Sequence, residues 1–104
     1  MSWLDKVTLF LGGVASGDPD LVKDLVSEDV KYRNGDTRFD GVDELIENCI
    51  ASPYKIQIIN WAYKNKLVFV EYRYWDYQEI HHKEVVGVYT LNPIGNICNI
   101  RIYE

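Results

Sequence analysis

The order of the predicted helices and strands restricts the possible folds of this chain more than any other feature of the sequence. From Pro53–Glu104 the hydrophobic pattern and the turn residues predict long strands over 54–64, 66–77, 79–92 and 96–104. The first half predicts three helices with a short strand pair among them. Helices followed by one strongly bent, mostly antiparallel sheet in 104 residues indicate a single α+β domain, 1–104. Such a chain is expected to form a cone with a pocket between helices and sheet.

Two boundary signals separate the first helices. Apolar residues recur at helical spacing from Trp3 to Val14, and Gly17 is expected to end this helix. Asp18 is expected to cap a second helix, because its side chain can accept a hydrogen bond from the first turn. The buried face of this second helix is predicted to reach Val26.

A hairpin and a third helix are expected next. Val30–Arg33 and Arg38–Phe39 predict short strands on either side of the turn Asn34–Asp36. The third helix is predicted to begin at Gly41, and Pro53 is expected to close the helical half of the chain.

The strand predicted over 66–77 has two different faces. One face carries Val68, Val70, Tyr72 and Tyr74. Alternation places Glu71 and Arg73 on the opposite face. Because charged groups prefer water, we assign the Val68 face to the helix side of the sheet.

The other face of the sheet, its outer face, is also partly apolar. Alternation places Phe69 and Trp75 there, together with Trp61 and Tyr63 from the neighbouring strand. A sheet that is apolar on both faces needs cover on both, which predicts a homodimer through the outer face. Scattered surface hydrophobic residues, which are common, are the alternative.

The net charge limits which partners the protein can bind, and the cysteine content indicates its cellular location. Phosphate backbones require a basic surface, so the formal net charge of −5 argues against nucleic acid and against an anionic membrane. Met1–Lys6 lacks the features of a signal peptide. Cys49 and Cys98 occupy apolar positions and are expected to be small buried residues without a disulfide. A cytoplasmic location is therefore expected.

Motifs for cofactors and metals are absent from the sequence. No glycine-rich phosphate loop follows a strand, so no cofactor is predicted. The adjacent His81 and His82 point to opposite faces of a strand and cannot chelate one metal, so no metal site is predicted. Asp76 and Glu104 end two strands and are expected near a pocket rim. An exposed hairpin position is the alternative for Asp76.

Three stretches carry a family resemblance. They are 17–30, beginning Gly17-Asp18-Pro19-Asp20; 39–46, which contains Gly41; and 89–97, around Pro93-Ile94-Gly95. Together they resemble the nuclear-transport-factor-2-like superfamily, which includes ketosteroid isomerases, limonene-epoxide hydrolases and SnoaL-type polyketide cyclases. The resemblance covers nearly the whole chain and implies the cone-shaped fold. This fold occurs in enzymes and in non-enzymes, so it implies no single activity.

The catalytic residues of ketosteroid isomerases do not match. That family uses a tyrosine and a protonated aspartate as hydrogen-bond donors and a second aspartate as base. The corresponding positions here hold Phe10, Gly87 and Tyr32, respectively. A phenol with an ordinary pKa of about 10 is a poor base at neutral pH. Steroid isomerisation by that mechanism is therefore not expected.

The resemblance also implies which side chains face the pocket. The expected ligand-binding residues are Phe10, Asn60, Tyr72, Tyr74, Gly87, Tyr89 and Ile100. Tyr32, Asp76 and His81 are the candidates for acid–base catalysis. Gly87 either enlarges the cavity or permits a bend in its strand. In so short a chain, side chains could also fill the cone completely.

Two functions agree with this pattern. The first is a SnoaL-like domain that binds, and as an enzyme converts, a small apolar or aromatic molecule. Such an enzyme would be a cofactor-independent isomerase, cyclase, lyase or hydrolase. The alternative is a non-catalytic homodimerisation or protein-interaction domain of the same fold, because the isomerase acid–base residues are missing.

Overall fold

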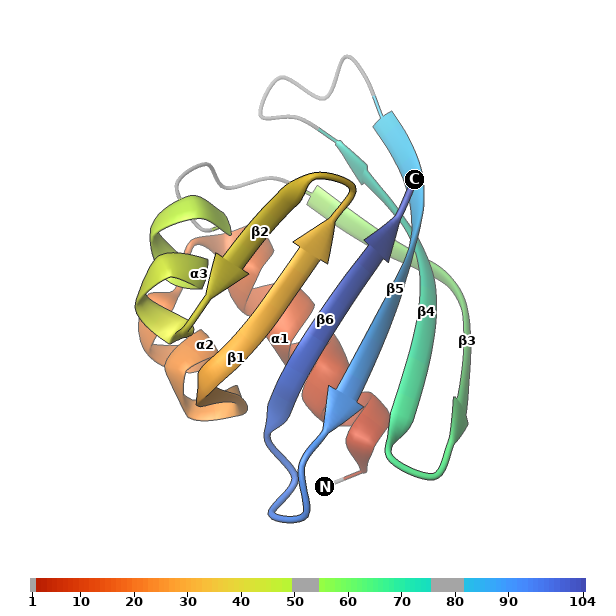
Figure 1. Cartoon of the computed structure of the whole chain (residues 1–104). Coiled ribbons are helices and arrows are strands. Elements are labelled where there is room, and N and C mark those ends of the chain that lie inside the picture. Colours follow the sequence, from red (N-terminus) through yellow and green to blue (C-terminus); the bar gives the residue numbers. More distant parts are fainter. Residues whose placement is uncertain (1, 50–54, 76–81) are drawn as a thin grey trace.

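The computed structural model describes residues 2–49, 55–75 and 82–104. Its helices are α1 (Trp3–Ser16), α2 (Pro19–Leu25) and α3 (Val42–Cys49). Its strands are β1 (Val26–Asn34), β2 (Thr37–Asp40), β3 (Lys55–Lys64), β4 (Leu67–Trp75), β5 (His82–Leu91) and β6 (Ile97–Tyr103). The order of elements is the predicted one (Figure 1).

The end of α1 and the start of α2 form as the sequence predicts, and α1 begins with a cap that was not predicted. Ser2 and Asp5 build a reciprocal capping box at the start of α1. Gly17 ends this helix in the left-handed conformation, with φ of 69°, where glycine has no steric penalty. The side chain of Asp18 accepts a hydrogen bond from the backbone N–H of Leu21, which starts α2.

The boundary between α2 and β1 differs from the prediction. Val26 has extended backbone angles, φ of −114° and ψ of 156°, and begins β1, so its predicted place on the second helix is wrong. It pairs with Ile97 of β6 and is buried. A β-branched valine fits a strand at least as well as a short helix, and pairing with β6 decides between them.

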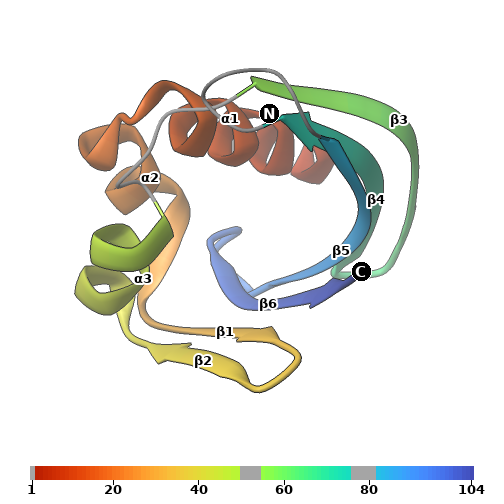
Figure 2. The ribbon, with the colours of Figure 1, turned by 90° about the horizontal axis from the view of Figure 1, so that it is seen from above.

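The strands form one sheet in the order β2-β1-β6-β5-β4-β3. The pair of β1 and β6 is parallel, and the other neighbouring pairs are antiparallel. Viewed from above, the sheet curls around, α1 lies along its concave side, and α2 and α3 close the side next to β1 and β2 (Figure 2). The predicted α+β class, with helices packed on a curved and mostly antiparallel sheet, is confirmed.

Apolar side chains fill the centre of the cone. On β4, Val68, Val70 and Tyr72 are buried against the helices, so the predicted inner face of this strand is confirmed. Phe10 of α1 meets Tyr89 of β5 edge-on, with ring centroids 6.0 Å apart. No charged side chain is buried among the residues that the structure describes.

Gly87 lies directly beneath the ring of Tyr89. A Cβ atom added at Gly87 would come within 2.7 Å of that ring. The two residues are neighbours on the same face of β5, and the tyrosine ring folds back over the glycine. The space that Gly87 leaves is therefore occupied by Tyr89 and does not remain as a cavity.

An extra residue in β3, Ile59, reverses the facing of the second half of that strand. Ile58 pairs with the buried Tyr72, whereas Asn60 pairs with Glu71 on the outer face. Such a β-bulge shifts the alternation of side chains by one position. Asn60 therefore lies on the outer face, and the prediction that it faces the pocket is wrong.

The same bulge moves two aromatic residues to the helix side. Trp61 now pairs with Val70 and Tyr63 with Val68, both fully buried, so the predicted outer-face position of the two aromatic residues is wrong. Their rings stack with centroids 6.2 Å apart and remain more than half exposed. Together with Trp3 they line a hollow of about 410 Å³ at the start of α1.

A second irregularity affects Cys98 of β6. Thr90 pairs with Asn99 but Leu91 pairs with Ile97, which leaves Cys98 in a bulge. Its thiol contacts the carbonyl oxygen of Thr90 at 3.4 Å. Cys98, expected to be buried, is only half-buried, and Ile97 is fully buried instead.

Candidate functional site

Strands β1, β4 and β6 end at the same end of the cone (Figure 1). Residues of these strands line a pocket of about 310 Å³. We call it the mouth pocket. It is lined by Tyr32, Asn34, Thr37, Phe39, Asn48, Cys49, Tyr72, Tyr74, Ile102 and Glu104. Of the residues predicted from the sequence, the structure brings Tyr32, Tyr72, Tyr74 and Glu104 together here.

A larger hollow, of about 670 Å³, lies between α2 and the start of α3. Its lining is dominated by charged side chains, among them Lys23, Glu28, Asp43 and Glu44, which are exposed at the surface. Size alone does not make a binding site. The mouth pocket combines apolar walls with converging polar groups, the usual composition of a small-ligand site.

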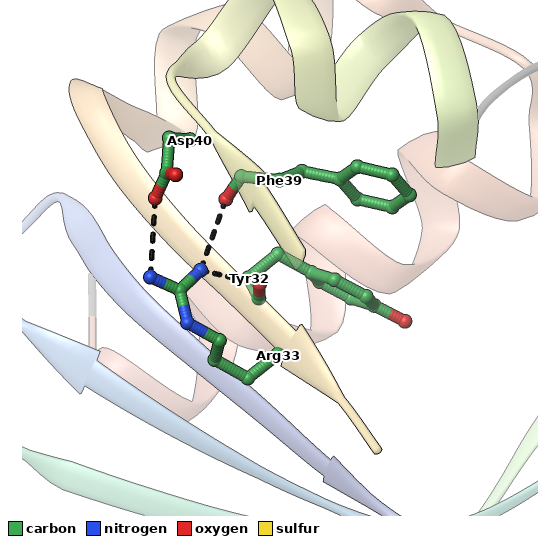
Figure 3. A network of polar contacts seen from close by, with 4 residues as sticks. All are labelled: Tyr32, Arg33, Phe39 and Asp40. Atoms are coloured by element: carbon green, nitrogen blue, oxygen red, sulfur yellow. Dashed lines mark hydrogen bonds and ion pairs between the residues drawn. The ribbon is translucent and has the colours of Figure 1, made fainter. Parts of the chain in front are cut away.

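One wall of the mouth pocket is the β1–β2 hairpin. Tyr32 of β1 stacks on Phe39 of β2, with ring centroids 5.2 Å apart and planes at 24°. Arg33 points to the other side, where its guanidinium donates hydrogen bonds to the backbone carbonyls of Tyr32 at 2.7 Å and Phe39 at 3.4 Å (Figure 3). It also pairs with Asp40 at 3.1 Å. One side chain thus fixes the two strands that present the stacked rings.

The opposite wall comes from β4. Tyr72 and Tyr74 follow each other on its inner face, with ring centroids 6.3 Å apart. The hydroxyl of Tyr74 donates a hydrogen bond to Oε1 of Glu104 at 3.2 Å. The other carboxylate oxygen of Glu104 lies 3.9 Å from Nζ of Lys83. A phenol, a carboxylate and an ammonium group therefore meet at the rim.

Two phenols and the thiol in the walls are held in their neutral forms. Burial, reinforced by the negative charge of Glu104, raises the pKa of Tyr74 to about 12. Burial also raises the pKa of Tyr32, although a hydrogen bond with Asn34 acts in the opposite direction. Burial raises the pKa of the Cys49 thiol to about 11. At neutral pH the phenols are hydrogen-bond donors, and the thiol is a poor nucleophile.

The remaining predicted residues lie elsewhere. Phe10, Tyr89 and Ile100 are buried in the core, at 4%, 0% and 0% exposure. Asp76 and His81 fall outside the described residues. In the described part of the chain, no group of three or more His, Cys, Asp or Glu side chains could hold a metal ion.

Several pocket residues were not predicted, although pairing rules indicate some of them. Phe39 is the direct antiparallel partner of Tyr32. Asn48, at the end of α3, has no comparable signal in the sequence, because its place depends on how α3 packs against β1.

None of the helices in the described ranges combines the length and the apolar content needed to cross a membrane. No protein-family model matches the sequence, and no curated protein matches it either.

Solved structures are similar over nearly the whole chain. An NTF2-like protein of unknown function from Cytophaga hutchinsonii is 14% identical, with a TM-score of 0.88 over 99% of this chain and 89% of that one. An LEH-like epoxide hydrolase from M. tuberculosis is 20% identical, with a TM-score of 0.84 over 97% of this chain and 80% of that one. An epoxide hydrolase/cyclase-like enzyme of pyran-ring formation in salinomycin is 18% identical, with a TM-score of 0.83 over 97% and 88%.

These identities are too low to transfer an activity, and they establish architecture alone. The agreement nevertheless extends from α1 to β6, as the sequence resemblance implied. The chain therefore has the nuclear-transport-factor-2-like fold.

Proposed function

We propose that this SnoaL-like domain binds a small molecule with an apolar or aromatic body in the mouth pocket. The observation that carries the proposal is the convergence of Tyr32, Tyr74 and Glu104 on one hollow of about 310 Å³. The deeper part of the cone is filled by the packing of Phe10 and Tyr89. A ligand would therefore sit at the rim and not in the interior.

The chemistry of the walls supports this proposal. Aromatic and aliphatic side chains supply apolar contact, and the phenols of Tyr32 and Tyr74 supply directional hydrogen bonds. Several similar solved structures bear the names of enzymes that act on small molecules, including an epoxide hydrolase and a cyclase-like enzyme.

If the bound molecule is converted, the roles of the side chains follow from their protonation. In a reaction that removes a proton from the bound molecule, Glu104 would take that proton, and the Tyr74 hydroxyl would turn from Glu104 to donate a hydrogen bond to the oxyanion that is left on the ligand. Tyr32, with its raised pKa, would also be a donor. The sequence-based candidates Asp76 and His81 remain predictions.

Native mass spectrometry of the protein purified without added ligand, followed by denaturing extraction, tests the proposal. We expect a small organic molecule to co-purify with the wild type. Replacing Tyr32 with alanine should reduce its occupancy, whereas Tyr103→Ala, on the exposed end of β6, should not. An empty wild-type protein, together with no small molecule that shifts the signals of the pocket residues in NMR spectra, would contradict the proposal.

A second candidate function is homodimerisation through the outer face of the sheet. Phe69 of β4 and Val86 of β5 each remain 37% exposed there, and Tyr103 of β6 remains 55% exposed. These residues, with Val88, form an apolar stripe that runs diagonally across three neighbouring strands, with Glu71 and Arg101 on its two flanks. Such a stripe on a sheet face is typical of a surface that a second copy covers.

Sedimentation velocity tests this second candidate. A dimer is expected for the wild type at micromolar concentration, and Phe69→Glu should convert it to a monomer by placing a charge in the stripe. Ile94→Glu, on the exposed β5–β6 turn, is the matched control and should leave the dimer intact. A monomeric wild type would exclude dimerisation as the function of this face.

A further inference from the structure

Four aromatic rings surround the mouth pocket, and we call them the aromatic cage: Tyr32, Phe39, Tyr72 and Tyr74. Two come from the β1–β2 hairpin and two from β4, which are separated by β6 and β5 in the curved sheet. The face of an aromatic ring carries negative electrostatic potential and attracts a cation that lies within about 6 Å. Cages of this composition are suited to ammonium groups.

A carboxylate stands at the edge of the cage. Glu104 is held there by the hydroxyl of Tyr74, which donates to it at 3.2 Å. This hydrogen bond holds one oxygen beside Tyr74, and the other oxygen lies 3.9 Å from Nζ of Lys83. Aromatic rings and a carboxylate together favour positive charge over neutral or negative groups.

The negative potential of Glu104 reaches both walls of the pocket. Its charge contributes to the raised pKa of Tyr74 on β4 and, more weakly, to that of Tyr32 on β1. The field that disfavours a phenolate at these sites would favour a cation between them. The formal net charge of −5 adds a long-range attraction of the same sign.

Lys83 does not already satisfy this carboxylate. Its Nζ lies 3.9 Å from Oε2 of Glu104, near the limit for an ion pair, and its side chain is 64% exposed. An exposed pair of this kind contributes little free energy. A ligand cation that is also in contact with the rings can therefore displace Lys83.

From these observations we propose that the mouth pocket recognises a small cationic ligand, in which an ammonium or quaternary ammonium group is attached to an apolar or aromatic body. The inference rests on the proposed function and specifies the ligand class for the same pocket. The pocket volume of about 310 Å³ suits one ring and one ammonium group. Larger ligands would extend out of the rim.

Three probes that share a phenyl ring test the charge preference. They are phenyltrimethylammonium, benzyl alcohol and phenylacetate, which are cationic, neutral and anionic. Affinity is measured by NMR titration, and the side-chain amide signals of Asn34 and Asn48 report whether a probe enters the mouth pocket. We expect phenyltrimethylammonium to bind roughly threefold to thirtyfold more tightly than benzyl alcohol, and phenylacetate to bind most weakly.

One matched pair of variants isolates the carboxylate. Glu104→Gln keeps a hydrogen-bond acceptor for Tyr74 but removes the charge, so it should abolish most of the preference for the cation and leave benzyl alcohol binding unchanged. Glu71→Gln removes an exposed carboxylate from the outer face and should leave the preference intact.

The outcomes separate the two proposals. Equal or tighter binding of benzyl alcohol or phenylacetate in the pocket would overturn the cation preference and leave the pocket function standing. A cation preference that survives Glu104→Gln would overturn the role of the carboxylate. If phenyltrimethylammonium leaves the signals of Asn34 and Asn48 unmoved, the cationic-ligand proposal is wrong, while the co-purification experiment still decides the proposed function.

Discussion

A single methyl group at Gly87 should destabilise the core. The Cβ atom of an alanine there would lie 2.7 Å from the ring of Tyr89, closer than side-chain atoms normally approach. Tyr89 is fully buried and packs edge-on against Phe10, so its ring cannot swing into solvent. The strain must therefore be distributed through the core.

The expected size of the effect combines two opposite terms. Overpacking of a core costs about 1–3 kcal/mol of unfolding free energy. Replacing glycine by alanine restricts the unfolded chain and offsets about 0.4–1 kcal/mol of that cost. For Gly87→Ala we expect a net loss of about 1–2 kcal/mol, measured by urea unfolding followed by tryptophan fluorescence.

Gly12 provides the control with the opposite sign. It lies in α1 with no atom within 4 Å of an added Cβ. Because alanine is the better helix former, Gly12→Ala should stabilise the protein by about 0.5–1 kcal/mol. In a Gly87→Ala background, Tyr89→Leu should cost less than it does alone, because the shorter side chain relieves the clash. A Gly87→Ala protein as stable as the wild type, or strictly additive changes at the two sites, would refute the reasoning.

Three further perturbations test other contacts. Lys6→Met removes the 2.7 Å hydrogen bond from Nζ to the carbonyl of Gly95, which joins α1 to the β5–β6 turn, and should cost about 1–2 kcal/mol in urea unfolding. The pKa of Tyr74 is raised to about 12, so the unfolded chain ionises first; stability should fall as pH rises from about 10 to 12, and Tyr74→Phe should flatten that fall. Arg33→Gln removes two hydrogen bonds and the Asp40 ion pair, and should speed amide hydrogen exchange in β2.

Each of these predictions has a clear contrary result. Lys23→Met, at an exposed position on α2, is the control for Lys6→Met and should change stability little. Parallel pH profiles of the wild type and Tyr74→Phe would show that burial of this phenol does not contribute to stability at high pH. Unchanged exchange in Arg33→Gln would show that the hairpin is rigid without the guanidinium.

The sequence predicted the architecture because most elements are regular. In β4, strict alternation assigned Val68 and Tyr72 to the inner face, and they are there. The bulge in β3 could not be predicted, because Ile58 and Ile59 are both apolar and the extra residue, Ile59, disturbs no recognisable pattern. The register of the residues after a bulge depends on how they pair with the neighbouring strand. The hydrophobic periodicity of a single strand contains no information about that pairing.

The candidate site was predictable only in part, for a related reason. Tyr32 and Tyr74 were expected near a pocket from the resemblance, and both line the mouth pocket. The interior is closed because the ring of Tyr89 lies over Gly87. The rotamer of this tyrosine cannot be predicted from the residue type alone. Arg33 donates hydrogen bonds to backbone carbonyls of β1 and β2. Every residue has a backbone carbonyl, so these contacts cannot be predicted from the types of the accepting residues.

The bulge at Ile59 also bears on solubility. β3 is an outermost strand of the sheet in the described part of the chain, so its far side offers backbone groups that another molecule could extend into a longer ribbon. The bulge interrupts the regular spacing of backbone hydrogen-bonding groups along β3, so a straight strand from another molecule cannot pair with its whole length. Deleting Ile59 would restore a continuous template beside Trp61, and the predicted consequence is self-association into fibres.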